Sequence, residues 1–354
     1  MTARFILVFL ALAAALFIAG CSDDKPTSIN PPSNTSTTTW NSAGYWDTID
    51  LDASSYDDYI FYSFSRRDTV TLTLEQALGS TAWDLGFRRV SILVNSGASG
   101  AGSTRALDLT AAGELDTTEF LSFNDISTVD TSGMQSGSYQ LNIDEWYSYN
   151  PVTHQLDLTN YVYIMADAIG GFVKLQVIGM ENPGMPPDMG TISIQNIYSD
   201  DRSFNESPDT LIFDATSGGP FYVDFSSGAT VNPPDPRTST EWDLELVSYE
   251  IHQNNTIFGP GNAGTYEVWQ DQNDPTDFSF THALPDSVPT FPDDYGSPCT
   301  DWYNYTGPPN HLILAKGNIM LIRSGNTSIK LQIQSYYNHD GGGDGFYTFR
   351  WLEM

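Results

Sequence analysis

Short apolar segments separated by Gly, Pro, Asn and Ser dominate the chain. Between Asp68 and Leu74, Val70, Leu72 and Leu74 alternate with Thr, which is typical of a strand with one buried face. Two hairpins and three single strands are predicted. These elements are 161–165 with 172–178 across Gly170-Gly171, 319–323 with 328–334 across Gly325-Asn326, and the strands 59–64, 68–74 and 346–351.

Helical patterns are scarce. Only Leu74–Leu78 and Asp116–Phe123 suggest short helical turns. Aromatic residues make up 13% of the 354 residues, and 29 Gly and 20 Pro provide many turns. The sequence therefore predicts an all-β fold of mainly antiparallel strands with minor short helices.

The first residues have the pattern of an export signal. Residues 1–20 hold one Arg and an apolar run, Phe5–Ile18, that is too short for a permanent membrane span and ends in small residues. Ile18-Ala19-Gly20-Cys21 resembles a lipobox, which predicts lipidation of Cys21. The alternative is an ordinary secretory signal, but Cys is scarce here and falls where the motif requires it.

Residues 21–45 are expected to be the lipidated Cys and a flexible tether, because the Pro, Ser, Thr and Asn that fill 26–39 cannot bury apolar surface. Ser22-Asp23-Asp24-Lys25 resembles the short acidic tag of Bacteroidetes surface lipoproteins. We expect an outer-membrane lipoprotein at the cell surface that contacts the membrane only through its lipid anchor.

The formal net charge of −30 argues against two classes of partner. Nucleic acid needs Lys and Arg to neutralise its phosphates, and anionic lipid needs a basic patch. Such acidity favours solubility instead. The second cysteine, Cys299, has no partner if Cys21 is lipidated, so we expect a half-buried apolar residue rather than a nucleophile.

The chain repeats itself in one order with little drift. Trp83-Asp84-Leu85 recurs as Trp242-Asp243-Leu244, an offset of 159 residues. Later pairs keep nearly the same offset: Asn95 with Asn254, Gly100-Ala101-Gly102 with Gly259-Pro260-Gly261, Trp146-Tyr147-Ser148-Tyr149 with Trp302-Tyr303-Asn304-Tyr305, and Lys174-Leu175-Gln176 with Lys330-Leu331-Gln332. A period of this length is that of a domain, so the sequence predicts tandem domains at 46–200 and 209–354.

The first copy resembles the HmuY family of surface haem-binding lipoproteins. The resemblance is carried by Ala53-Ser54-Ser55-Tyr56, Tyr62-Ser63-Phe64-Ser65, Trp83-Asp84-Leu85, Arg88-Arg89, Asn95-Ser96-Gly97, Ser99-Gly100, Tyr161-Val162-Tyr163 and Lys174-Leu175-Gln176. It implies two tandem HmuY-like β domains, haem b as cofactor, and a TonB-dependent outer-membrane receptor as partner. The residues themselves favour folding roles, with Trp83 as a core anchor, Asp84 tying its turn and the Gly residues forming a tight loop.

The resemblance also implies two iron ligands per domain, one in the variable stretch after the Gly-rich loop and one shortly after the later Trp. Imidazole suits axial iron, and a Met thioether can replace it. The candidate pairs are therefore His282 with His311, and Met134 with His154. Pro151 and Gly307, which cannot ligate through a side chain, occupy the family's usual second position.

Alternatives stay open at these positions. A histidine in a loop is commonly a solvated polar residue, and His252 and His339 are expected to be exposed. The rival function is a noncatalytic envelope module that binds glycan, peptide or protein after losing iron ligation. No nucleophile–His–acid order, distinctive carboxylate pair or phosphate loop is present, so an enzyme is not expected.

Overall fold

The computed structural model describes residues 39–40, 47–123, 128–181, 183–184, 188–266, 274–279, 290–338 and 343–354. The predicted signal peptide, Cys21, His282 and His339 lie outside these residues, as does the tether apart from Thr39–Trp40. No helix in the described part is long and apolar enough to cross a membrane.

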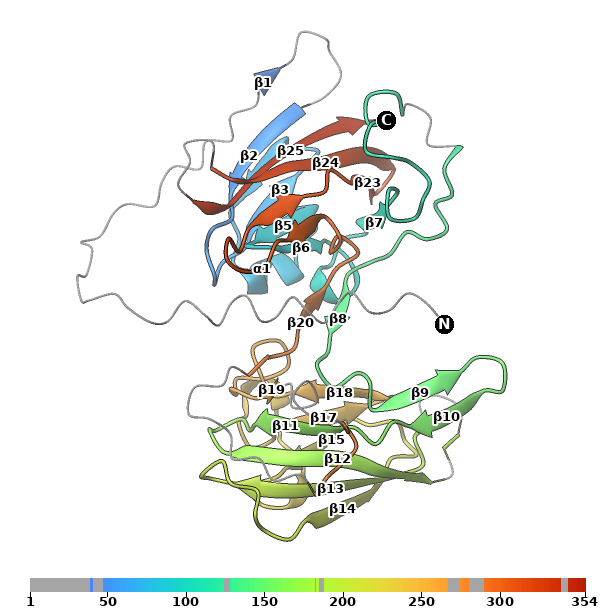
Figure 1. Cartoon of the computed structure of the whole chain (residues 1–354), viewed down its shortest axis with the longest axis vertical. Helices are drawn as coiled ribbons and strands as arrows, with labels where there is room; N and C mark the ends of the chain where they lie inside the picture. The colour runs from blue at the N-terminus through green and yellow to red at the C-terminus, as the bar shows by residue number, and fades with distance from the viewer. Residues whose placement is uncertain are drawn as a thin grey trace, which may run out of the picture. The chain divides into compact units, whose positions relative to one another are not determined.

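Antiparallel strands form almost all of the regular structure, which confirms the all-β prediction (Figure 1). The short helix α1 (Leu74–Leu78) lies where it was predicted. The Thr73 hydroxyl accepts from the backbone N–H of Gln76, and the Gln76 side chain accepts from the backbone N–H of Thr73, so α1 begins with a reciprocal cap. The segment Asp116–Phe123 forms turns, with Phe123 N donating to the carbonyl of Glu119.

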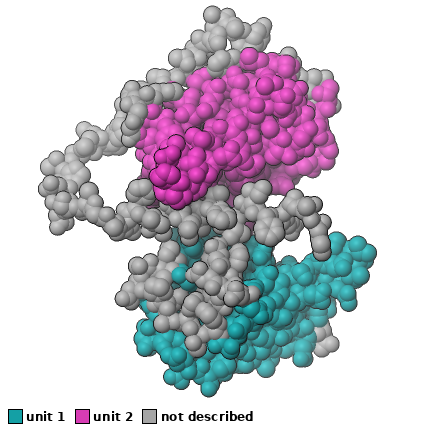
Figure 2. Space-filling model, in the orientation of Figure 1, with its two compact units in different colours: residues 1–17, 140–294 teal, residues 18–139, 295–354 magenta. Residues whose placement is uncertain are grey.

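The described residues divide into two compact units (Figure 2). Unit 1 is Gln140–Asp294, and unit 2 combines the residues up to Tyr139 with Tyr295–Met354. These boundaries differ from the predicted domains 46–200 and 209–354. The reason is strand pairing, because the C-terminal strands of the chain insert between strands from its first third.

Unit 2 holds two sheets. The larger has the order β1-β2-β25-β24-β23-β7 and the smaller the order β4-β3-β5-β6. The strands are β1 (Thr39–Trp40), β2 (Asp47–Asp52), β3 (Ile60–Ser63), β4 (Asp68–Val70), β5 (Leu85–Arg88), β6 (Ser91–Val94), β7 (Arg105–Asp108), β23 (Ile319–Ser324), β24 (Thr327–Tyr337) and β25 (Asp344–Glu353). Both sheets contribute to one apolar core, where the rings of Tyr62 and Phe349 meet edge to face at 5.5 Å.

Unit 1 repeats this architecture apart from β1, which has no counterpart among its described strands. Its sheets have the orders β14-β13-β12-β11-β19 and β16-β15-β17-β18. The strands are β11 (Val162–Ala166), β12 (Phe172–Glu181), β13 (Thr191–Ser199), β14 (Asp209–Asp214), β15 (Phe221–Asp224), β16 (Ala229–Val231), β17 (Leu244–Val247), β18 (Glu250–Gln253) and β19 (Gly264–Tyr266). Val173, Leu175, Val223 and Leu244 belong to its core.

Two connecting strands and two small hairpins complete the structure. The connecting strands β8 (Ser138–Gln140) and β20 (Asp294–Gly296) pair with each other. The hairpins are β9 (Tyr147–Asn150) with β10 (Gln155–Leu158) in unit 1, and β21 (Tyr303–Tyr305) with β22 (Ile313–Ala315) in unit 2. The two larger predicted hairpins are confirmed as β11–β12 and β23–β24.

The repeated tryptophans occupy like settings. Each indole is 1% exposed and donates to the carbonyl six residues before it, Trp83 to Ala77 at 2.8 Å and Trp242 to Pro236 at 3.0 Å. The following carboxylates, Asp84 and Asp243, each accept from a backbone N–H of the neighbouring strand end at 2.8 Å. The predicted core role of Trp83 is confirmed, whereas the Asp84 side chain binds the end of β3 rather than its own turn.

The Gly-rich loops are shaped by a buried asparagine in each unit. Asn95 donates to the carbonyl of Trp83 at 2.6 Å and accepts from Gly102 N at 2.8 Å. Asn254 makes the same two bonds to Trp242 and Gly261. A Cβ at Gly100 would lie 2.2 Å from Asn95 Oδ1, so the loop requires glycine for this close approach.

Candidate functional site

In unit 1, His154 lies in the turn of the β9–β10 hairpin. Its backbone N–H donates to the carbonyl of Asn150 at 2.8 Å, and its φ of 57° places it in the left-handed region. The side chain is exposed, and its Nδ1 shares a hydrogen bond with the Tyr149 hydroxyl at 2.6 Å. The hairpin therefore presents an imidazole whose orientation is fixed by a neighbouring tyrosine.

The equivalent hairpin of unit 2, β21–β22, carries His311 in the same way. Its backbone N–H donates to the carbonyl of Gly307 at 2.9 Å, and its φ is 51°. The Tyr305 hydroxyl and Nδ1 of His311 share a short hydrogen bond. Two separate parts of the chain thus build the same tyrosine–histidine pair in the same backbone conformation.

This pairing determines what the imidazoles can do. When Nδ1 carries the proton and donates to the tyrosine oxygen, Nε2 keeps its lone pair for a metal. Each hairpin also carries an exposed apolar side chain, Val152 at 86% and Leu314 at 46% exposure. A nitrogen donor on the same hairpin as an exposed apolar side chain fits the chemistry of haem, which needs an axial ligand and an apolar face.

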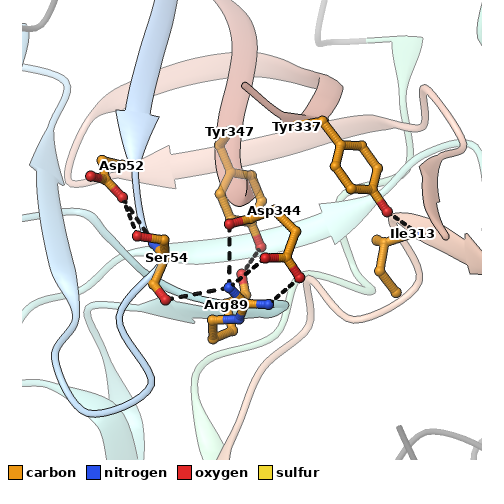
Figure 3. A network of polar contacts seen from close by, with 7 residues as sticks. All are labelled: Asp52, Ser54, Arg89, Ile313, Tyr337, Asp344 and Tyr347. Atoms are coloured by element: carbon orange, nitrogen blue, oxygen red, sulfur yellow. Dashed lines mark hydrogen bonds and ion pairs between the residues drawn. The ribbon is translucent and has the colours of Figure 1, made fainter. Parts of the chain in front are cut away.

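The base of the unit 2 hairpin is anchored firmly. The Trp302 indole donates to the carbonyl of Val90 at 3.1 Å, and Ile313 N donates to the Tyr337 hydroxyl at 2.7 Å. Figure 3 shows the adjoining polar network, in which Arg89 forms an ion pair with Asp344. These contacts restrain the hairpin from which His311 projects.

The central residue of that network is Arg89. Its φ of 48° is unusual for a non-glycine residue, and its guanidinium also donates to the carbonyl of Ser54 at 3.3 Å. Burial is the largest single effect and lowers the pKa of Arg89, but the Asp344 hydrogen bond and the electrostatic interactions with Tyr336, Asp344 and Tyr56 together outweigh it, so the net pKa is raised. Tyr347 completes the network by donating to the carbonyl of Arg89 at 2.6 Å. The turn from β5 to β6 is therefore held from both sides.

The structure places the predicted ligands Met134 and His154 in different units, and the other predicted pair lies partly outside the described residues. Met134 belongs to unit 2, where it is partly buried against a cluster that includes Phe120 and Leu321. His154, its predicted partner, belongs to unit 1. His311 belongs to unit 2, while its predicted partner His282 lies outside the described residues.

The prediction that His252 is exposed is wrong, because only 5% of it is accessible. Its Nδ1 lies 2.7 Å from Glu245 and its Nε2 lies 2.9 Å from Glu250, while its ring stacks on Phe258 at 3.9 Å. Burial alone lowers the pKa of His252, but the two carboxylates outweigh it and the net pKa is raised. An imidazole with both nitrogens engaged is a structural group, not a metal ligand.

Cys299 is more buried than predicted, at 3% exposure. Burial raises the pKa of its thiol to about 12, so the thiolate form is negligible near neutral pH. It forms no disulfide within the described chain. This confirms an apolar role rather than a nucleophilic one.

The sequence predicted both hairpin histidines but missed their tyrosine partners. The available signal was the recurrence of Trp-Tyr-x-Tyr, whose last residues are Tyr149 and Tyr305. No group of three His, Cys, Asp or Glu suited to a metal occurs among the residues that the structure describes.

Comparisons with known proteins agree with the sequence resemblance. Residues 55–193 match the model of the HmuY protein family. No curated protein matches the chain.

Three solved structures also align with it. A protein of Bacteroides vulgatus ATCC 8482, named as HmuY-like and heme-binding, is 10% identical, with 90% of this chain and 96% of that chain covered and a TM-score of 0.35. A protein of Bacteroides fragilis NCTC 9343, named as a lipoprotein, is 11% identical, with 89% and 92% covered and a TM-score of 0.36. The apo HmuY analog of Tannerella forsythia is 9% identical, with 87% and 95% covered and a TM-score of 0.34. At these TM-scores the structural likenesses carry no argument. The family model matches residues 55–193, which is less than half of the chain, and over that part the chain is similar to the HmuY family.

Proposed function

We propose that this chain binds haem, or a related hydrophobic ligand, through the turns of its β9–β10 and β21–β22 hairpins. The observation that carries the proposal is the repeated tyrosine–histidine pair, Tyr149 with His154 and Tyr305 with His311. The match of residues 55–193 to the HmuY family model supports the same ligand class.

Each of these residues would have a distinct role in binding. His154 and His311 would each offer Nε2 to iron, while the tyrosine oxygen holds Nδ1 and so fixes the ring orientation. Haem, when bound, supplies an iron centre that accepts axial nitrogen or thioether ligands. Exposed Val152 and Leu314 would cover apolar parts of the ligand.

The division into units changes the pairing of ligands that we propose. Met134 and His311 share unit 2, so within that unit they are the described residues that would offer a thioether and an imidazole to iron. Met134 would have to leave its present apolar contacts to reach a ligand. In unit 1, His154 is the candidate among the described residues.

An absorbance titration tests the proposal. Apo protein without its first 21 residues is titrated with haemin in both redox states, and we expect a shifted Soret band. His154→Ala and His311→Ala should each remove part of the signal and together abolish it. Thr153→Ala and Asn310→Ala, which change the neighbouring turn residues, should leave the titration intact.

Tyr149→Phe and Tyr305→Phe refine the assignment. Loss of the Nδ1 partner should weaken haem binding roughly 10- to 100-fold without removing the Soret shift. An unshifted Soret band in the parent protein would reject haem and leave the noncatalytic glycan-, peptide- or protein-binding module as the function. A Soret shift that survives both histidine changes would reject these ligands only.

We also propose that Cys21 carries lipid, that the protein lies at the outer-membrane surface, and that it delivers its ligand to a TonB-dependent receptor. The predicted lipobox and acidic tag support the location. Cys21→Ala should release the protein from the membrane fraction. Protease added to intact cells should degrade the parent protein, and its protection there would reject surface exposure.

A further inference from the structure

Each unit joins the first half of one sequence copy to the second half of the other. In unit 2, Trp302 from the second copy donates to the carbonyl of Val90 from the first copy at 3.1 Å. In unit 1, Trp146 from the first copy donates to the carbonyl of Tyr249 from the second copy at 3.2 Å. Both tryptophans are 1% exposed; the bond in unit 1 is buried, and the bond in unit 2 is partly buried.

The repeated Lys-Leu-Gln motif makes equivalent contacts between halves. Lys330 donates to the carbonyls of Phe120 and Phe123, and Lys174 donates to the carbonyl of Phe278 at 2.9 Å. The amides two residues further on reach the same turns, Gln332 to the carbonyl of Thr117 at 3.2 Å and Gln176 to that of Thr276 at 3.0 Å.

Strand pairing between the halves is equivalent too. β25 of the second copy pairs with β2 of the first, and β13 of the first pairs with β14 of the second. At the opposite edge β23 pairs with β7, and β11 pairs with β19. The two half-to-half surfaces are therefore built from the same contacts, in the same order.

A single connection joins the Tyr295–Met354 segment of unit 2 to unit 1, because the chain leaves unit 1 once after Asp294 and then ends in unit 2. The connecting strand β20 begins there and pairs only with β8, whose three side chains are all exposed. No described contact requires that the Tyr295–Met354 segment and the β2–β7 part of unit 2 belong to the same molecule.

We propose that a second copy of this chain is a partner for unit 2, by reciprocal exchange of Tyr295–Met354 between two molecules. Unit 1 stays intact in each molecule, because Gln140–Asp294 is continuous. The tethered segment has the higher effective concentration, so the monomer is favoured in dilute solution. The charge of −30 opposes association, so the exchanged dimer increases with protein concentration and with salt.

A disulfide trap tests the exchange in the chain of residues 22–354 carrying Cys299→Ala. Asp50 and Thr348 face each other across β2 and β25, and their side chains hydrogen-bond at 2.6 Å. One sample mixes a chain carrying Asp50→Cys with a chain carrying Thr348→Cys. The matched control mixes Asp50→Cys with Gln334→Cys, because Gln334 is exposed on β24 and is not paired with Asp50. A single chain carrying both Asp50→Cys and Thr348→Cys reports the pairing within one molecule.

The chains are unfolded together, refolded at high protein concentration and in salt, and then oxidised. We expect a cross-linked dimer from the Asp50→Cys and Thr348→Cys mixture, and at least fivefold less from the control mixture. Dilution before oxidation should reduce it, while the double variant cross-links within one chain. Monomers alone from the mixture, together with a cross-linked double variant, would overturn the exchange. A double variant that folds without cross-linking would overturn the strand pairing on which the exchange depends.

Discussion

The carbonyl of Val90 accepts a hydrogen bond from the indole of Trp302, although 212 residues separate them. The bond joins the turn between β5 and β6 to the start of the hairpin that carries His311. Trp302 also contacts the rings of Tyr303 and Tyr347, at 4.7 and 5.1 Å. The stability of unit 2 should therefore depend on this indole.

Trp302→Ala should destabilise unit 2 by about 3–5 kcal/mol, because it removes a large buried side chain and leaves the Val90 carbonyl without its donor. Trp302→Phe should cost less, about 1–3 kcal/mol. Urea unfolding followed by hydrogen exchange measures both values. Unit 1 amides should keep their protection in both variants, and equal loss in the two units would contradict the assignment of Trp302 to unit 2.

Lys330 should make stability rise with pH above neutrality. Its side chain is fully buried, and burial, together with nearby Arg350, lowers its pKa to about 8 from 10.5. Between these pH values the unfolded chain binds a proton that the folded chain does not. The free energy of unfolding should therefore increase from pH 8 to 10.5 by an amount on the order of 1–3 kcal/mol relative to Lys330→Met.

The matched control is Lys316→Met, which removes a more exposed lysine paired with Asp301. This variant should retain the rise with pH that Lys330→Met loses. Guanidinium unfolding at pH 7, 8.5 and 10 measures it. If the free energy of unfolding changed with pH equally in the parent protein and in Lys330→Met, the lowered pKa of Lys330 would be contradicted.

His252 should give the opposite pH dependence. Its raised pKa means that its contribution to stability is complete below the unfolded value of about 6.5 and is lost as pH rises through the folded value. Its ring contacts Glu245, Glu250 and Phe258, and it interacts electrostatically with Asp293. Tyr222 donates to Glu245, and Arg237 lies over the ring of Phe258.

The two carboxylates that bind His252 should differ in how much they contribute to stability. The Glu245 side chain is 16% exposed and that of Glu250 is 54% exposed, so water screens the second ion pair more. Glu245→Gln should therefore remove more of the pH-dependent stability than Glu250→Gln. NMR titration of the His252 ring and thermal unfolding at pH 5.5 and 8.5 measure the effect. Equal effects of the two variants would reject this ranking.

Gly100→Ala and Gly259→Ala should both destabilise their units by about 1–3 kcal/mol, because the new methyl group would overlap the buried asparagine. The nearest Asn Oδ1 atoms would lie at 2.2 and 2.0 Å. Gly79→Ala is the control, since its Cβ meets no atom closer than 4.0 Å. Thermal unfolding of the three variants checks the ordering, and a cost at Gly79 equal to that at Gly100 would contradict it.

Local structure was predictable from the sequence where alternating apolar residues and turn-forming residues determine it without long-range contacts. The hairpins across Gly170-Gly171 and Gly325-Asn326 formed as expected, because paired apolar strands flank residues that favour turns. The repeat also predicted that Trp83 and Trp242 share one setting, as their indole bonds confirm.

The pairing of halves was not predictable from the same pattern. The matched offsets are identical whether the half after Trp146 folds onto its own copy or onto the other, so the repeat leaves the choice open. Only long-range strand pairing, such as β25 with β2, decides it. For this reason Met134 and His154 were expected to lie together but belong to different units.

The burial of polar residues was also not predicted from the sequence. His252 precedes Gln253-Asn254-Asn255, a run that suggests an exposed loop. The structure buries all four, and Gln253 is satisfied by Asp293 at 2.7 Å and Asn254 by the carbonyl of Trp242. The polarity of a sequence segment does not show whether the fold supplies the hydrogen-bond partners that allow the segment to be buried.

The discontinuity of unit 2 also sets an order for biosynthesis. Unit 1 has all of its residues once Asp294 has been made, whereas the strands beginning at Asp47 must wait for Tyr295–Met354 before their larger sheet can close. Closure over so long a separation is slow and leaves apolar strands uncovered during translation. Premature termination just after Asp294 would therefore spare the middle of the polypeptide and ruin its earliest-made part.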